Sequence, residues 1–241
     1  MLKNIAAQDE TSWNPPVENQ PFPIQFALEL PDVPVLRETL LLLDLKSHES
    51  CVDLREVSEI ILADAGATLQ LLRFASREYG DVEYRPQRIE DCISDFGLRA
   101  CIECMSVQTL SYGNRHLAAP EVWQHATEIA YHCKLVAEEM PDVNPEEAYL
   151  AGLLHNIGVL PAVLGWDLKG ESAADEAFTG FSLARKWALP QCVVDFFSEM
   201  YLTGYPKRWM PIVEMAHQRA DRSLTDCSFE QAIGPQLHMQ V

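Results

Sequence analysis

Residues 148–160 read AYLAGLLHNIGVL and place the dipeptide His155-Asn156 inside an otherwise apolar segment. The start of a helix is marked just upstream, because Asn144 is a good N-cap residue and Pro145 suits the first helical position. Apolar residues fall on every side of this predicted helix, as expected for a helix in the middle of a domain. A buried His-Asn pair needs hydrogen-bond partners or a ligand, so these two side chains are candidates for a functional site.

The same segment has to be tested as a membrane span. From Ala148 to Trp166 the sequence contains no Asp, Glu, Lys or Arg, and a run of about 18 apolar residues can form a transmembrane helix. However, His155 and Asn156 lie in the middle of the run, and Pro161 would break the helix. We therefore expect a core helix followed by a turn, and no contact with a membrane.

Composition limits the kinds of partner. The chain has 241 residues, of which 48% are hydrophobic, so it can form one large domain or two small ones with a substantial core. Its formal charge is −18, and such an acidic surface repels nucleic acid and anionic membranes. The start, MLKNIAAQDE, lacks the apolar region of a signal peptide, so we expect a cytoplasmic protein whose seven cysteines are reduced. We interpret the CxxC of Cys101 and Cys104 as helix packing residues.

Helical patterns dominate from Pro34 onward, and no strand pattern, heptad run or internal repeat is visible. The sequence therefore predicts an all-α fold, a multi-helix bundle of two packed lobes. We expect an N-terminal arm at 1–31, a first helical lobe at 32–115, a second at 116–224 and a C-terminal tail at 225–241. Residues 165–181 are predicted to be a Gly-rich acidic connection, and a helix is predicted from Gln191 to Tyr201.

Two histidines are predicted to approach each other. His125 lies on a long helix that begins at Pro120, and His155 lies on the next helix. Antiparallel helices joined by a short turn would bring both imidazoles together. Two histidines and a carboxylate would begin a metal site, but Asn156 is neutral and a weak ligand. The spacing alone favours a pair of hydrogen-bonded core histidines, with a metal site as the alternative.

Several phrases, taken in order, resemble a known family. They are LPDVPVLRETLLLL, ADAGATLQLLRFAS, IEDCISDFG, VWQHATEIA, YLAGLLHNIG and RKWALPQCVVDFF. Their order resembles that of HDOD domains, the HD-related output domains of bacterial signalling proteins, over roughly residues 30–220. The resemblance implies an all-α bundle in which an N-terminal helical lobe packs on an HD-like lobe. It also implies a regulatory role, since members often have no demonstrated catalysis.

The departures from the HD phosphohydrolase pattern bear on mechanism. The aspartate of the HD pair is Asn156 here, and of the metal-binding set only His125 and His155 persist. The other ligand positions fall on Glu176, Met200, Tyr201 and His217, with Asp221 one helical turn further on. Metal-bridged hydrolysis needs carboxylates to hold the ions and offset their charge. The resemblance therefore implies a degenerate site, formed by His125, His155, Asn156 and Glu176, with no metal or other cofactor. We assign no role to His217 by itself.

A local basic cluster stands out in the acidic chain. It consists of Arg73, Arg77, Arg85, Arg88 and Arg99. Such a cluster is usually a solvated face paired with acidic neighbours. The alternative is a contact patch for an acidic partner or a nucleotide phosphate, and we name Arg73, Arg77, Arg85 and Arg88 as its candidates.

Three functions remain open from the sequence. The leading hypothesis is a non-catalytic signalling module that binds a protein partner, or a small ligand in the cleft between the lobes. The second is a metal-dependent phosphohydrolase acting on a nucleotide or cyclic dinucleotide, with Glu176 and Asp221 as unexpected ligands. The third is a structural helical scaffold with neither ligand nor partner.

Overall fold

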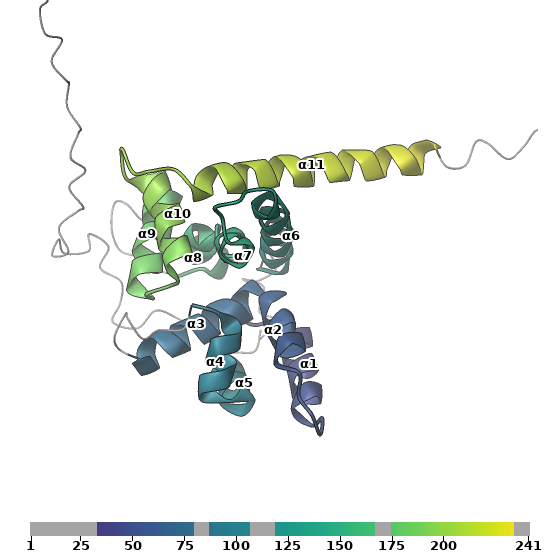
Figure 1. Ribbon diagram of the computed structural model, residues 1–241, viewed down its shortest axis with the longest axis vertical. Helices are drawn as coiled ribbons and strands as arrows, with labels where there is room; N and C mark the ends of the chain where they lie inside the picture. Colours follow the sequence, from purple (N-terminus) through teal and green to yellow (C-terminus); the bar gives the residue numbers. More distant parts are fainter. Residues whose placement is uncertain (1–32, 80–86, 107–118, 167–174, 234–241) are drawn as a thin grey trace, which may run out of the picture.

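The computed structural model describes residues 33–79, 87–106, 119–166 and 175–233 (Figure 1). Within these ranges every regular element is a helix and no β-strand occurs. The elements are α1 (Arg37–Ser47), α2 (Leu54–Leu62), α3 (Ala65–Tyr79), α4 (Ile89–Phe96), α5 (Leu98–Met105), α6 (Ala119–Glu138), α7 (Pro145–Leu153), the 3-10 helix η3 (Ile157–Val159), α8 (Leu160–Leu164), α9 (Glu176–Lys186), α10 (Gln191–Tyr201) and α11 (Trp209–Ile233). The predicted all-α fold is confirmed, and α10 has the predicted bounds.

The helices form two packed lobes. In Figure 1, α1 to α5 lie together below α6 to α11, and α3 is the helix that packs on α6. The predicted boundary between the lobes, at residues 115 and 116, lies outside the described residues, as does the predicted arm at 1–31. At the other end, α11 is a single helix that continues through residue 225, where the tail was predicted to begin.

A buried carboxylate organises the first lobe. Asp64 is fully buried and accepts hydrogen bonds from the amides of Leu36, at 2.8 Å, and Gly66, at 2.8 Å. It also accepts from the amide of Ala67, at 3.2 Å, so it caps the start of α3 and holds the segment before α1 against it. Burial raises the pKa of this carboxyl, whereas these hydrogen bonds lower it.

Direct contacts join the two lobes. The hydroxyl of Tyr149 on α7 donates to the carbonyl of Leu62 at 3.0 Å, and the amide of Gln191 donates to the side chain of Gln87 at 3.3 Å. In addition, one continuous hydrophobic core includes residues of α1 and α3 in the first lobe and of α6 and α7 in the second. The first lobe therefore supports the helices that carry the candidate site.

The segment that decides the fold is buried, but it is not one helix. Asn144 caps α7 by accepting a hydrogen bond from the amide of Glu146 at 2.9 Å, as predicted, and Pro145 is its first residue. The helix then ends at Leu153, and a turn through His155 leads into η3 and α8. The prediction of one helix through residue 160 was therefore wrong. The predicted core positions hold, because Leu150, Leu153, Leu154, Ile157 and Leu160 are all buried.

Two glycines explain this path. A Cβ atom on Gly152 would lie 2.9 Å from the Cα of Ala130, so α7 can pack this closely on α6 only with glycine there. A Cβ atom on Gly158 would overlap the carbonyl oxygen of Glu176, at 2.1 Å, so η3 lies directly against the start of α9. By length and composition, Pro145–Leu164 could also cross a membrane; 61% of the tested window is buried, and a core helix passes the same test.

The predicted connection at 165–181 is also shorter than expected, because α9 begins inside it. Asp175 caps this helix by accepting a hydrogen bond from the amide of Phe178 at 3.1 Å. Gly180 diluted the helical pattern in the sequence, but the ring of Phe197 occupies the space that its side chain would need. The acidic composition therefore predicted a connection where a capped helix begins.

Truncation of the central segment should destabilise the protein. Leu154 is 1% exposed and Leu45, on α1, is 67% exposed. We expect Leu154→Ala to lower the free energy of unfolding by about 2–5 kcal/mol, because it leaves a cavity in the core. The matched control Leu45→Ala should change it by less than about 0.5 kcal/mol. Urea denaturation followed by circular dichroism measures both, and equal effects would show that the segment is not part of the core.

Candidate functional site

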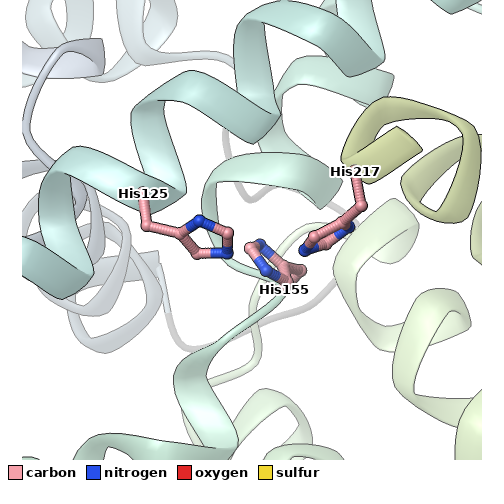
Figure 2. Close-up of side chains that lie close together, drawn as sticks. All are labelled: His125, His155 and His217. Carbon is pink, nitrogen blue, oxygen red and sulfur yellow. The ribbon is translucent and has the colours of Figure 1, made fainter. Parts of the chain in front are cut away.

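Three histidines from three separate elements meet in the second lobe (Figure 2). His125 comes from α6, His155 from the turn after α7, and His217 from α11. The ring centroid of His155 lies 5.3 Å from that of His125 and 5.0 Å from that of His217, and the other pair is 5.3 Å apart. One nitrogen from each ring belongs to a set whose members all lie within 4.8 Å of one another.

The approach of His125 to His155 follows from the packing of α6 on α7. The predicted antiparallel pair is present, and the absence of a side chain at Gly152 brings the two helices into backbone contact. His155 is the third residue after that glycine, so its ring reaches the α6 surface at His125. The sequence prediction that these two imidazoles come together is in agreement with this geometry.

His217 is positioned by the two attachments of α11. At its start, the buried carboxylate of Glu199 accepts hydrogen bonds from the amides of Trp209, at 2.9 Å, and Met210, at 2.7 Å. Further along, Arg219 forms a bidentate pair with Glu139 at the end of α6, at 3.1 and 2.8 Å. The negative charge of this carboxylate, at the N-terminus of α11, also interacts favourably with the helix dipole. His217 lies between these two fixed points.

Backbone carbonyls orient two of the rings. The Nδ1 atom of His155 lies 2.6 Å from the carbonyl oxygen of Gly152, and the Nδ1 atom of His217 lies 2.8 Å from that of Val213. A carbonyl oxygen can only accept, so each Nδ1 carries the hydrogen and donates it. The Nε2 atom of each neutral ring is then an acceptor with a free lone pair. The Nε2 of His155 is buried and has no hydrogen-bond partner among the described residues.

Burial favours the neutral form of the His125 and His155 rings. Burial lowers the pKa of His155 to about 3, although its hydrogen bond to Gly152 acts in the opposite direction. Burial also lowers the pKa of His125, with a smaller contribution from the neighbouring His217. Neutral imidazole is the form that binds metal ions.

An open cavity of about 280 Å³ lies beside the histidines. His155, Asn156 and His217 border it on one side, and the side chains of Phe196, Phe197 and Met200 line it on another. The exposed carboxylates of Glu176 and Glu214 also border it, and no Lys or Arg does so among the described residues. The cavity is therefore apolar inside and negatively charged at its mouth.

The cavity brings together most of the predicted degenerate site. The cavity is bordered by His155, Asn156 and Glu176. The ring of His125 does not border it but contacts the ring of His155. Met200 also borders it, whereas the ring of Tyr201 lies against Phe178 and Phe181 instead. Asp221 is exposed on α11 and close enough for its charge to act on His125.

Sequence analysis missed the third histidine. We assigned no role to His217 because it is isolated in the sequence, more than 60 residues after His155. Its only signal was the resemblance to the HD pattern, which places a ligand position at His217. A histidine is also a metal ligand, so this position keeps a side chain that can bind a metal ion.

The arginines of the predicted contact patch do not share one exposed surface. Arg73 is 3% exposed, and its guanidinium lies 4.7 Å from the ring centroid of Trp187, so it belongs to the lobe interface and cannot contact a partner. Including Arg73 in a surface patch was therefore wrong, because its helix packs between the lobes. Arg88 is exposed but pairs with Glu146 of the other lobe at 2.9 Å. Arg77 is exposed, and Arg85 lies outside the described residues.

The junction between the lobes offers the predicted small ligand a narrow internal cavity and an open surface depression of about 540 Å³. The cavity between α3 and α6, bordered by Leu69, Trp123 and Leu153, measures about 20 Å³. That is the space of a single water molecule. An open depression lies at the outer edge of the junction, beside Tyr131 and Tyr149. The histidine cavity in the second lobe is the better candidate for a ligand site, because it has convergent polar groups.

The CxxC cysteines are free, and their positions agree with packing. Cys101 is buried, and the thiol of Cys104 donates to the carbonyl of Cys101 at 3.1 Å. Burial raises the pKa of the Cys101 thiol to about 11 and that of the Cys104 thiol to about 12. Both therefore stay protonated and unreactive at neutral pH.

Comparison with known proteins identifies the family. The sequence model of the HDOD domain matches residues 33–165, which is more than half of the chain. The chain belongs to the HDOD family. The match covers the first lobe and α6 to α8 of the second, so the HDOD region includes His125, His155 and Asn156, whereas His217 lies beyond it.

Solved structures share this fold. The HDOD chain is similar to the MmoQ response regulator from Methylococcus capsulatus str. Bath, with 22% identity, a TM-score of 0.62, and coverage of 80% of this chain and 88% of that one. A structure of MmoQ fragment 20–298 gives 21% identity, a TM-score of 0.61, and coverage of 80% and 86%. At these identities the likeness concerns the fold alone. No curated protein matches the sequence.

Neutral His155 should make stability depend on pH. Its pKa is about 3 in the folded chain and about 6.5 without the fold, so between these values only the unfolded chain takes up the proton. Above pH 6.5 the His155 side chain has no effect on how the free energy of unfolding changes with pH. Below that pH it lowers the free energy of unfolding, by up to about 1.4 kcal/mol per pH unit.

The measurement is urea denaturation between pH 7.5 and about 4.5, with a chelator present. We expect His155→Gln to lose less stability than the wild type as the pH falls. His48→Gln, at an exposed histidine on the far side of the molecule, serves as the control and should follow the wild type. A parallel pH dependence in His155→Gln and wild type would contradict the assignment.

Proposed function

We propose that this HDOD chain is a regulatory module of a signalling pathway that binds a protein partner or a small ligand and does not hydrolyse phosphoesters. One observation carries the proposal. The cluster at the HD position contains three imidazoles and no carboxylate among the described residues, and an amide, Asn156, follows His155.

Phosphoester hydrolysis by bridged metal ions depends on carboxylates. They hold the ions, and their negative charge lets two cations stay close together. Imidazole and amide side chains supply no such negative charge. Glu176 and Glu214 lie at the cavity mouth, outside the histidine cluster.

The cavity also disfavours a phosphate substrate. Phosphate sites use Arg, Lys or backbone amides at a helix N-terminus. Here the described residues that border the cavity include two carboxylates and no basic side chain, on a chain whose formal charge is −18. A neutral or cationic ligand, or a protein segment with apolar and basic side chains, fits this surface better.

The similarity of fold to MmoQ, which is a response regulator, supports a role in signalling. The regulatory character that the HDOD resemblance implies supports the same role.

The second candidate is a metal-dependent phosphohydrolase with unusual ligands. The observation that favours it is the position of the histidines beside an open cavity that Glu176 also borders. Asp221, one turn after His217, would supply a further carboxylate. This candidate predicts turnover that depends on the histidines.

A phosphodiesterase assay separates the two candidates. Purified protein with added Mn²⁺, Mg²⁺, Fe²⁺ or Zn²⁺ should not hydrolyse nucleotides, cyclic dinucleotides or an activated phosphodiester above background. Asn156→Asp should also remain inactive, because one carboxylate does not restore the missing set. Turnover that disappears in both His125→Ala and His155→Ala, but persists in His132→Ala on the same helix, would establish the enzyme instead.

The binding role has its own test. We would purify the tagged chain from its native cells and quantify the proteins and small molecules that accompany it. Glu176→Lys reverses a charge at the cavity mouth, and Glu78→Lys makes the same change on an exposed face of α3. We expect a specific partner or ligand to be lost with Glu176→Lys and retained with Glu78→Lys. Identical profiles for the wild type and both variants would argue against binding at this cavity.

A further inference from the structure

We propose that His125, His155 and His217 bind one divalent transition-metal ion of the Zn²⁺ type, which fastens α11 to α6 and to the turn after α7. This inference goes beyond the proposed function, because it holds whether or not the chain acts in signalling. It also replaces our expectation of no metal, which rested on Asn156 in place of the HD aspartate and on the changed ligand positions at Glu176, Met200 and Tyr201.

The first argument is the unsatisfied lone pair at the centre of the cluster. The Nε2 atom of His155 is buried with no hydrogen-bond partner in the described part of the chain. Its acceptor lone pair faces the other rings: in Figure 2, a nitrogen of His125 and a nitrogen of His217 both point toward the His155 ring. A buried acceptor without a partner, such as the Nε2 atom of His155, costs free energy unless a donor or a cation reaches it. One cation shared by the three ring nitrogens, which all lie within 4.8 Å of one another, would satisfy all of them at once.

The second argument is the orientation of the rings. A histidine that binds a metal through one nitrogen usually donates its other N–H to a carboxylate or a backbone carbonyl, which fixes the tautomer and the ring plane. Here the Nδ1–H of His155 is held by Gly152 at 2.6 Å, and that of His217 by Val213 at 2.8 Å. The supporting hydrogen bonds of a metal site are therefore already formed on two of the three ligands.

The third argument is the spacing. The three ligand nitrogens lie within 4.8 Å of one another. A tetrahedral ion with Zn–N distances of about 2.0–2.1 Å places its ligand nitrogens roughly 3.3 Å apart. Side-chain rotations that bring each nitrogen about 1 Å toward the common centre close this difference. His125 and His217 are half-buried and border open space on one side, so their rings can make this adjustment.

The donor set selects the kind of ion. Mg²⁺ and Ca²⁺ prefer oxygen ligands, whereas three neutral imidazoles suit Zn²⁺, Co²⁺, Ni²⁺ or Cu²⁺. The fourth position faces the cavity that His155 and His217 border, where a water molecule or a small ligand can complete the coordination. Nearby carboxylates, Glu128 and Asp221, act on His125 from outside the cluster and favour a positive charge there.

The proposed ion would change how α11 is held. In the described residues this helix is attached by Glu199 at its start and by Arg219 to Glu139 beyond the histidine. An ion at His217 would add a third attachment between them. Ligands that bind only the folded chain raise its stability in proportion to their affinity and concentration.

The test uses the full chain, stripped of metal with a chelator and carrying Cys51→Ser to remove an exposed thiol. Calorimetric titration with Zn²⁺ should give one ion per chain, and elemental analysis after gel filtration should give the same ratio. Binding should weaken by more than about tenfold in His217→Gln, which keeps the size of the side chain but loses the ligand. His132→Gln, at a histidine of α6 outside the cluster, should bind like the parent.

Two further measurements keep the test decisive. Circular dichroism must show that His217→Gln is folded; if it is not, His125→Gln replaces it. The Co²⁺-loaded protein should show the visible spectrum of a tetrahedral nitrogen site without a thiolate charge-transfer band. No stoichiometric binding, or equal binding in His217→Gln and the parent, would overturn the proposal. Metal binding with no turnover in the phosphodiesterase assay would leave the proposed function intact, and turnover without metal binding would overturn both.

Discussion

The contact between α6 and α7 at Gly152 is the constraint on which the second lobe depends. Any side chain there would meet the backbone of Ala130, so the glycine sets the distance between the two helices. That distance places His155 against His125, and the carbonyl of Gly152 also fixes the His155 ring through its Nδ1–H. One residue without a side chain thus controls both the packing of the lobe and the orientation of its central imidazole.

The helices were largely predictable because their signals are local. The cap at Asn144 and the periodic apolar residues act within one or two turns of the chain, and this cap is present. The end of α7 was not predictable in this way. The chain turns at His155 because Gly158 has to meet the backbone of Glu176, a contact between residues 18 positions apart that leaves no trace in local helix propensity. For the same reason α9 remained hidden in a stretch whose composition resembles a loop.

The candidate site was predictable in part. His125 and His155 could be paired because they lie on consecutive helices joined by a short turn. His217 could not, since its place depends on the two attachments of α11 and on a chain reversal that the sequence does not specify. For Arg73 the sequence led to a wrong prediction. Arginine is usually exposed, so its position in a basic cluster indicated a surface, yet its stem is buried and its planar head lies over Trp187.

The length of α11 has a mechanical consequence. The helix has 25 residues, which corresponds to about 37 Å, and Figure 1 shows its C-terminal part running past α6 away from the body. The hydrogen bonds described for this helix attach its first half to the lobe, at Trp209, Met210 and Arg219. Any tilt of this anchored half would therefore be amplified at the far end of the helix. A tilt of about 10° at His217 would move the far end, 16 residues further on, by roughly 4 Å, given about 1.5 Å of rise per residue. A small change at the buried rings would thus be amplified at the surface.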